Sequence, residues 1–256
     1  MTRRGLIVGL LVVLLPASCS VKEDRSSCPC WLDLALSGGA EREVDLWVWD
    51  GAPVREETAS LEGGQALARL EIPRGRLQLV AWSGLHACRT DGENICMLPG
   101  EEMDELYAAA TPLDARGDRA EASVTLHKQF VRVHLGIVGT DSASYPFRIE
   151  IRGEMRGFSL PDLRPLPGGF RVALTPVIGT YHRVVLPRQQ PGSRLVLAFY
   201  EAGGGTAPQA EFPLGESLEA AGYDWNKTNL DDVFLDVDYA EATLRIRIRD
   251  WETEEL

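Results

Sequence analysis

Hydrophobic and polar residues alternate along most of the chain, in short runs that end at glycine, proline or acidic residues. Alternation with a period of two is typical of half-buried β-strands. It predicts twelve strands, at residues 31–36, 44–49, 67–72, 77–82, 122–126, 130–138, 147–151, 170–174, 182–186, 195–200, 233–239 and 242–251. This number of short strands predicts an all-β chain with two tandem β-sandwich domains.

Two short segments have helical spacing instead. Residues 101–109 carry acids in their first turn and place Met103 and Leu106 on one side, and residues 216–221 end at Gly222. We therefore expect one or two short helices that act as packing elements. The stretch near residues 113–119 is polar and turn-rich. From it we expect an N-terminal sandwich over residues 31–126 and a C-terminal sandwich over residues 127–256.

The clearest alternation lies at residues 244–249, where aliphatic side chains share one face and arginines share the other. A tight hairpin with residues 233–239 would match both faces of the two strands. Each favourable cross-strand pair contributes about 0.2–1 kcal/mol. The predicted register pairs Asp232 with Arg249, Val233 with Ile248, Leu235 with Ile246, Asp236 with Arg245 and Val237 with Leu244.

The chain begins with the features of an export signal. Arg3 and Arg4 precede an uncharged apolar run at residues 5–15. A helix of about 12 residues rises roughly 18 Å, less than the ~30 Å hydrocarbon core, so we expect no permanent membrane span. Small residues then lead to Cys19, which resembles the lipobox where bacterial lipoproteins are cleaved and acylated. Pro16 departs from the aliphatic residue that is usual at its position.

Residues 1–18 are therefore expected to be a lipoprotein signal peptide and residues 19–30 a lipidated linker, with Cys19 as the lipid attachment site. Two or more acyl chains hold a protein stably at a membrane. Residues 22–24 (KED) resemble the tag that sends Bacteroidota lipoproteins to the exterior of the outer membrane. A plain secretory signal with an incidental cysteine is the alternative.

The mature chain is strongly acidic. Without the signal peptide, 24 basic and 38 acidic residues remain, a net charge of −14. Phosphate binding needs a concentrated basic surface, so we expect no nucleic-acid partner.

Four cysteines besides Cys19 are candidates for disulfides in an exported protein: Cys28, Cys30, Cys88 and Cys96. Three connectivities are possible. The stiff Cys28-Pro29-Cys30 segment does not close easily on itself, so a link from it to the loop between Cys88 and Cys96 is geometrically the most attractive. A zinc site is the competing interpretation, but the usual spacing of two to four residues is absent.

No catalytic arrangement is evident in the sequence. The four histidines are scattered without a partner at a useful spacing, and the acidic pairs match no calcium loop. No nucleotide-binding glycine motif is present either. We therefore expect no enzyme activity, no metal and no cofactor.

Trp47 and Trp49 lie two residues apart and so face one side of a strand. They either form an exposed platform for sugar stacking or pack under a loop or against the second domain, and tryptophan is usually buried when it can be. A further motif, Asp141-Ser142-Ala143, matches the short sequence at which Bacteroidota proteins are O-glycosylated.

Three stretches of the mature chain resemble the fimbrillin-associated anchor lipoproteins of the Bacteroidales. The first is residues 22–34 (KEDRSSCPCWLDL). The second lies near the end, where residues 218–225 (LEAAGYDW) lead to 230–233 (LDDV) and 248–252 (IRDWE). The third, residues 126–130 (LHKQF), is similar to the domain junction of that family.

The resemblance implies two transthyretin-like β-sandwich domains and a non-catalytic role. Members of that family hold the base of a fimbrial shaft at the outer membrane and limit its length and release. The expected partners are shaft subunits, bound through strand-mediated contact, in which a partner adds a strand to an open sheet edge. The alternative is a surface glycan-binding lipoprotein of a polysaccharide-uptake system, for which Trp47 and Trp49 would be the stacking surface.

Overall fold

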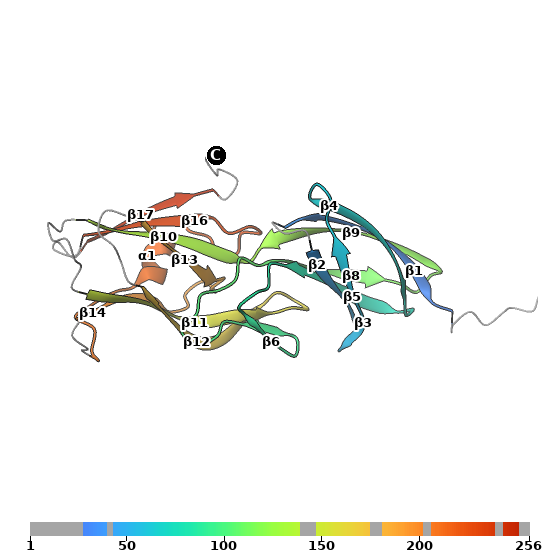
Figure 1. Cartoon of the computed structure of the whole chain (residues 1–256), viewed down its shortest axis with the longest axis horizontal. Helices are drawn as coiled ribbons and strands as arrows, with labels where there is room; N and C mark the ends of the chain where they lie inside the picture. Colours follow the sequence, from blue (N-terminus) through green and yellow to red (C-terminus); the bar gives the residue numbers. More distant parts are fainter. Residues whose placement is uncertain are drawn as a thin grey trace, which may run out of the picture.

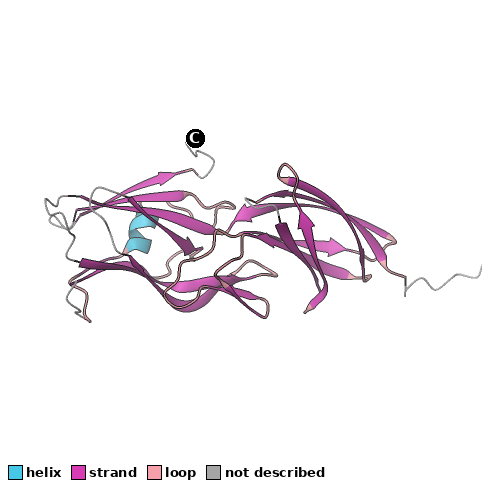
Figure 2. Cartoon of the chain, viewed as in Figure 1, coloured by secondary structure: helices cyan, strands magenta, loops and turns pink. Residues whose placement is uncertain are grey.

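The computed structural model describes residues 28–39, 43–138, 147–174, 181–201, 206–238 and 243–250. These residues form seventeen strands and one helix, arranged as two β-sandwiches along the long axis of the molecule (Figures 1 and 2). The expected all-β fold with two tandem sandwiches is confirmed.

The first sandwich contains seven strands: β1 (Cys30–Gly38), β2 (Glu43–Trp49), β3 (Pro53–Ser60), β4 (Gln65–Ile72), β5 (Arg76–Ser83), β8 (Tyr107–Asp114) and β9 (Arg119–Lys128). Their order is β3-β2-β5-β8-β9-β1-β4. Strands β8 and β9 are joined only at Tyr107↔Lys128 and Ala108↔His127. The sheet therefore turns a corner there, so that β3-β2-β5-β8 faces β9-β1-β4.

The second sandwich has one sheet in the order β13-β10-β16-β17, formed by β10 (Phe130–Val138), β13 (Tyr181–Pro187), β16 (Asp232–Asp238) and β17 (Thr243–Arg249). The other sheet contains β11 (Phe147–Ser159), β12 (Pro165–Leu174), β14 (Leu195–Glu201) and β15 (Ala210–Phe212). A hairpin of β6 (Arg89–Asp91) and β7 (Asn94–Cys96) pairs with the end of β11. This hairpin comes from the chain between β5 and β8 of the first sandwich.

The two sandwiches repeat one arrangement of strands. In the first, β1 pairs antiparallel with β4 and parallel with β9; in the second, β10 pairs in the same way with β13 and β16. The facing sheets β3-β2-β5-β8 and β12-β11-β14-β15 also match strand for strand, all antiparallel. Strand β17 extends the second sandwich and has no counterpart in the described part of the first.

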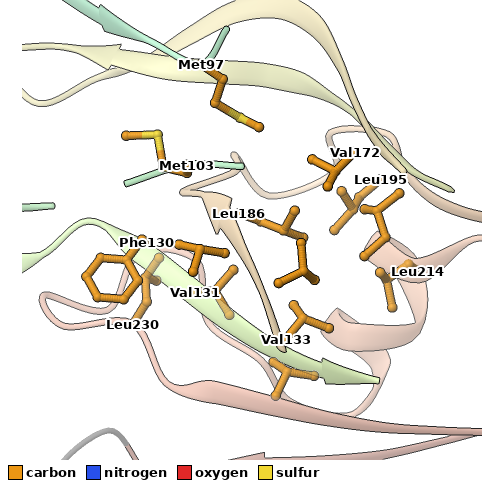
Figure 3. Packing of buried hydrophobic residues seen from close by; sticks show 14 of the residues in the cluster. Met97, Met103, Phe130, Val131, Val133, Val172, Leu186, Leu195, Leu214 and Leu230 are labelled. Atoms are coloured by element: carbon orange, nitrogen blue, oxygen red, sulfur yellow. The ribbon is translucent and has the colours of Figure 1, made fainter. Parts of the chain in front are cut away.

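Each sandwich encloses its own core. In the first, alternate residues of β1, from Cys30 to Leu36, point inward against Leu46 and Leu79. In the second, Val131, Val133 and neighbouring aliphatics fill the space between the sheets (Figure 3). Met97 and Met103 enter this second core from the segment between β7 and β8. That segment therefore packs with the second sandwich before the chain returns to the first.

All twelve predicted strands are present, and the register predicted for the last hairpin is confirmed at all five pairs. The helix expected at residues 216–221 is also present, as α1 (Leu214–Ala220). The prediction of a helix at residues 101–109 is wrong.

The segment at residues 101–109 is not helical because its groups have other partners. The carboxylate of Asp104 accepts hydrogen bonds from the backbone N–H groups of His86, Ala87 and Cys88 at 2.7–3.0 Å. From Tyr107 the chain is strand β8, paired with β5. Asp104 therefore fixes the loop after β5, and Glu102 accepts a hydrogen bond from the backbone N–H of Val185 in β13.

Candidate partner-binding surface

Both sandwiches end in sheet edges that pair with no other described strand. In the first sandwich these are β3 and β4, and in the four-stranded sheet of the second they are β13 and β17. Strand β3 carries Pro53 and exposed charged residues, and β12 of the facing sheet carries Pro165 and Pro167. Proline and charge protect an edge from pairing. Strand β17 contains no proline, and its charged residues lie on one face, whereas the consecutive charges of β3 occupy both faces.

The inner face of β17 is incompletely covered. Leu244, Ile246 and Ile248 are half-buried, whereas their cross-strand partners on β16, Val237, Leu235 and Val233, are fully buried. The aliphatic row of β17 therefore lies at the margin of the second core.

The outer face of the same sheet carries aromatic rings and guanidinium groups around Phe234. The His134 ring stacks on Phe234 with centroids 4.4 Å apart and planes 6° from parallel, and Tyr181 meets the Phe234 ring edge-on at 5.9 Å. Arg249 lies over the same ring at 4.8 Å and Arg247 at 5.5 Å. We call this group, together with Arg245, the arginine face.

Asp236 is the carboxylate that faces Arg247 on this surface. It accepts a hydrogen bond from the Tyr181 hydroxyl, and Arg247 donates to both Asp236 (3.3 Å) and the Tyr181 oxygen (2.8 Å). The hydrogen bond to Asp236 raises the pKa of Tyr181. Asp236 and Asp232 lie opposite Arg245 and Arg249 in the register, but no ion pair joins either arginine to a described residue. The guanidinium groups of Arg245 and Arg249 therefore remain available to a further carboxylate.

His134 is expected to make stability depend on pH. Burial lowers its pKa below the ordinary 6.5, and Arg183, Arg132 and Arg249 add to the effect against the opposing charge of Asp232. The unfolded chain therefore takes up this proton first, so the stability contributed by neutral His134 is complete above pH 6.5 and is lost as the pH falls through the folded pKa.

A His134→Phe variant, which keeps a flat ring against Phe234, should accordingly lose less stability than wild type between pH 7 and pH 5. Urea unfolding at the two pH values measures the difference. Equal losses in both proteins would contradict the assignment.

The free edge of β4 borders a second surface. A groove of about 670 Å³ runs over β4, β1 and β9 and is lined by Ala35, Leu67, Arg69 and Ser123 among others. Leu67 is 89 % exposed, and Arg69 pairs across the strands with Asp33 at 2.6 Å. An open edge beside an exposed leucine makes this a further candidate for partner contact.

An ionic cluster joins the two sandwiches on the same face of the sheet as the arginine face. Lys128, at the end of β9, is 1 % exposed and donates to Asp232 of β16. Arg132 bridges Asp232 (3.5 Å) and Glu105, to which it donates twice, at 2.8 and 3.0 Å. Burial lowers the pKa of Lys128, and the hydrogen bonds from Arg132 lower that of Glu105.

A second, half-buried cation lies at the same junction. The Arg188 guanidinium donates to the Gln129 side chain and to four backbone carbonyls. The sequence predicted neither of these clusters. The available signal was Lys128 itself, which has the same parity as the inward-facing Val124 and Leu126 of its strand.

The four cysteines within the described ranges are free thiols. Cys28 is exposed and Cys30 is buried at the start of β1. Cys88 is buried in the second core, and Cys96 is buried at the end of β7. The link favoured by the sequence, from the Cys28–Cys30 pair to the Cys88–Cys96 pair, is not formed. Burial raises the pKa of Cys88 to about 12.

The two neighbouring tryptophans pack against protein. Trp47 and Trp49 stack at 5.9 Å, Trp47 meets Trp82 edge-on at 4.8 Å, and both indoles are half-buried against the second core. They lie on the outer face of β2, opposite the buried Val44, Leu46 and Val48. This geometry favours the packing interpretation over a platform for sugars.

Other predicted positions fall outside the described residues, among them Cys19 and Asp141-Ser142-Ala143. Within the described ranges no helix is long and apolar enough to span a membrane. The same ranges hold no group of three or more histidine, cysteine and acidic side chains that could bind a metal.

Similarity to known proteins is found at the level of structure. No protein-family model matches the sequence, and no curated protein matches it either. The chain is similar to the fimbrial anchor protein Mfa2 from Porphyromonas gingivalis, with a TM-score of 0.60 and 13% identity, over 88% of this chain and 98% of that one. The chain shares its fold with a fimbrial anchor protein.

Two solved structures from Bacteroides thetaiotaomicron share this anchor-type fold as well. A candidate polysaccharide-binding protein gives a TM-score of 0.64 at 15% identity, over 87% of this chain and 96% of that one. A candidate adhesin gives 0.63 at 15% identity, over 88% and 97%. In each case the likeness covers both sandwiches.

Proposed function

We propose that this chain is a non-catalytic lipoprotein of the outer membrane, exposed at the cell surface, that anchors a fimbrial shaft and limits its length. The observation that carries the proposal is the fold shared with Mfa2 over nearly the full length of both chains. The sequence adds the lipobox-like residues before Cys19 and the three stretches that resemble anchor lipoproteins.

The arrangement of the described residues is consistent with an anchor. Cys30, which begins β1, lies at the end of the molecule away from the second sandwich (Figure 1). A lipid on Cys19 would therefore place the first sandwich next to the membrane and the second sandwich outward. The proposed units are a signal peptide at residues 1–18, a linker at 19–30 and domains at 31–126 and 127–256.

The partners in this proposal are fimbrial shaft subunits that add a strand to a free edge, such as β4 or β17. Strand addition gives affinity through main-chain hydrogen bonds and specificity through alternate side chains. The second candidate function is glycan binding in a polysaccharide-uptake system. It is favoured by the likeness to a candidate polysaccharide-binding protein, while the packed indoles of Trp47 and Trp49 give it no support.

A pull-down of the tagged protein, extracted with detergent from the membranes of its native cells, tests the proposal, with bound chains identified by mass spectrometry. We expect fimbrial subunits to co-purify. Recovery of only a sugar-uptake complex of the outer membrane would contradict the anchor function and favour glycan binding.

A further inference from the structure

We propose that β17 is the strand on which the partner docks, and that the docking segment is an extended strand with acidic residues at every second position. This inference rests on the proposed function and gives it a specific edge and a partner chemistry. Three independent features of β17 support it: its backbone, its inner face and its outer face.

The backbone of β17 is available on one side. The strand pairs with β16 over seven residue pairs from Asp232↔Arg249 to Asp238↔Thr243, and it ends the sheet. Its other side therefore presents the N–H and C=O groups of an edge strand, which pair readily with an added strand. Besides the β6–β7 hairpin, β17 is the strand outside the two repeats of seven, so it extends its sheet beyond the common sandwich.

The inner face of β17 offers apolar surface that an added strand would cover. Leu244, Ile246 and Ile248 remain half-buried because no described strand lies beyond them. A partner strand with aliphatic residues on its inner side would continue the second core outward. Burial of such side chains contributes favourably in proportion to the area removed from water.

The outer face sets the charge of the partner. Arg245, Arg247 and Arg249 recur at every second residue, which spaces their Cα atoms by roughly 6.8 Å along the strand. Acidic residues at alternate positions of a neighbouring strand have the same spacing, so each arginine can meet one carboxylate. In a chain with a net charge of −12, this basic row is complementary to an acidic segment and repels a basic one.

The same features of β17 argue against other partners at this edge. A second copy of β17 would place arginines opposite arginines, which is unfavourable. A polysaccharide would use the outer face alone and leave the aliphatic row and the backbone unsatisfied. The membrane is also excluded as the expected partner, since β17 lies in the sandwich farther from the start of β1 (Figure 1).

The test uses the full mature protein and a labelled eight-residue peptide that alternates valine and glutamate, with fluorescence anisotropy as the readout. A peptide that alternates valine and lysine is the charge control. A third peptide has the valine–glutamate sequence with backbone N-methyl groups at alternate residues. These groups remove the N–H donors along one edge of the peptide strand. We expect binding of the glutamate peptide only, weakened as NaCl rises from 50 to 300 mM.

A triple variant, Arg245→Glu, Arg247→Glu and Arg249→Glu, should lose at least tenfold in affinity for the glutamate peptide. The matched control carries Arg55→Glu, Arg164→Glu and Arg194→Glu, an equal charge change at exposed arginines outside β17, and should stay within twofold of wild type. A triple glutamine variant of β17 serves if the glutamate variant does not fold, and it should also bind at least tenfold more weakly.

Equal binding of the lysine peptide, or undiminished binding by both β17 variants, would overturn the proposal. Binding of polygalacturonate without binding of the glutamate peptide would overturn it in favour of an anionic glycan. In the pull-down from native cells, fimbrial subunits retained by the triple variant would refute β17 as the docking strand and leave the anchor function intact. Their absence with wild type as well would refute the anchor function.

Discussion

A Cys19→Ser variant expressed in the native cells is expected to lose all fatty-acid labelling and to leave the membrane fraction. The thiol of Cys19 is the predicted acylation site, and serine cannot accept a thioether-linked lipid. Stable anchoring requires two or more acyl chains. No helix in the described ranges provides a substitute membrane span. The variant should therefore be recovered in the medium or in the soluble fraction.

The measurement is metabolic labelling with an alkynyl fatty acid, followed by separation of membrane and soluble fractions. Cys28→Ser is the matched control, because Cys28 is an exposed cysteine only nine residues farther along the chain. That variant should keep the label and stay in the membrane fraction. A Cys19→Ser protein that remains labelled, or that stays with the membrane, would show that the signal is not a lipobox.

Lys128→Met is expected to destabilise the protein by about 3–5 kcal/mol. Lys128 is 1 % exposed and its ammonium group donates to the buried carboxylate of Asp232. Methionine fills a similar volume, so the loss comes mainly from the charge left on Asp232. Arg132 contacts the same carboxylate at 3.5 Å, which compensates in part and places the expected value toward the lower end of the range.

Urea unfolding of the mature protein measures the effect, with Lys227→Met as the control. Lys227 also pairs with an aspartate, Asp231, but it lies at the surface, where such pairs contribute about 0–1 kcal/mol. Combining Lys128→Met with Asp232→Leu should recover at least half of the lost stability, because it removes the unpaired charge. A loss below about 1 kcal/mol for Lys128→Met would show that the pair does not hold the junction.

The sequence predicted the elements in which the residue patterns on both faces of a strand require the same pairing. Residues 131–137 alternate without interruption, and β10 has the expected bounds, Phe130–Val138. The hairpin of β16 and β17 was predictable because aliphatic pairs and opposite charges require the same register. In both cases local alternation and cross-strand pairing lead to one answer.

Elements that depend on distant contacts were not predictable. Strand β8 was partly assigned to a helix because the role of Asp104 as an acceptor for the loop at residues 86–88 is not visible locally. Strand β3 is polar on both faces, so its sequence pattern is that of a loop. The hairpin of β6 and β7 crosses to the second sandwich, which no periodicity could indicate.

The candidate site likewise combines features that the sequence predicted with features that it did not. Alternation placed the arginines of β17 on one face, but the sequence could not show that the strand ends its sheet or that its aliphatic row is half-buried. The stacking of His134 on Phe234 follows from the parallel pairing of β10 with β16, two strands almost 100 residues apart. Such contacts depend on the order of strands in the sheet.

The most direct test of the anchor function is the fate of the fimbriae in cells that carry only the Cys19→Ser protein. Fimbriae on the cells and in the medium are counted and their lengths measured by electron microscopy, beside cells with wild-type protein. We predict that fimbriae are shed into the medium and are longer than in wild type. Fimbriae that stay attached with an unchanged distribution of lengths would contradict the proposed function.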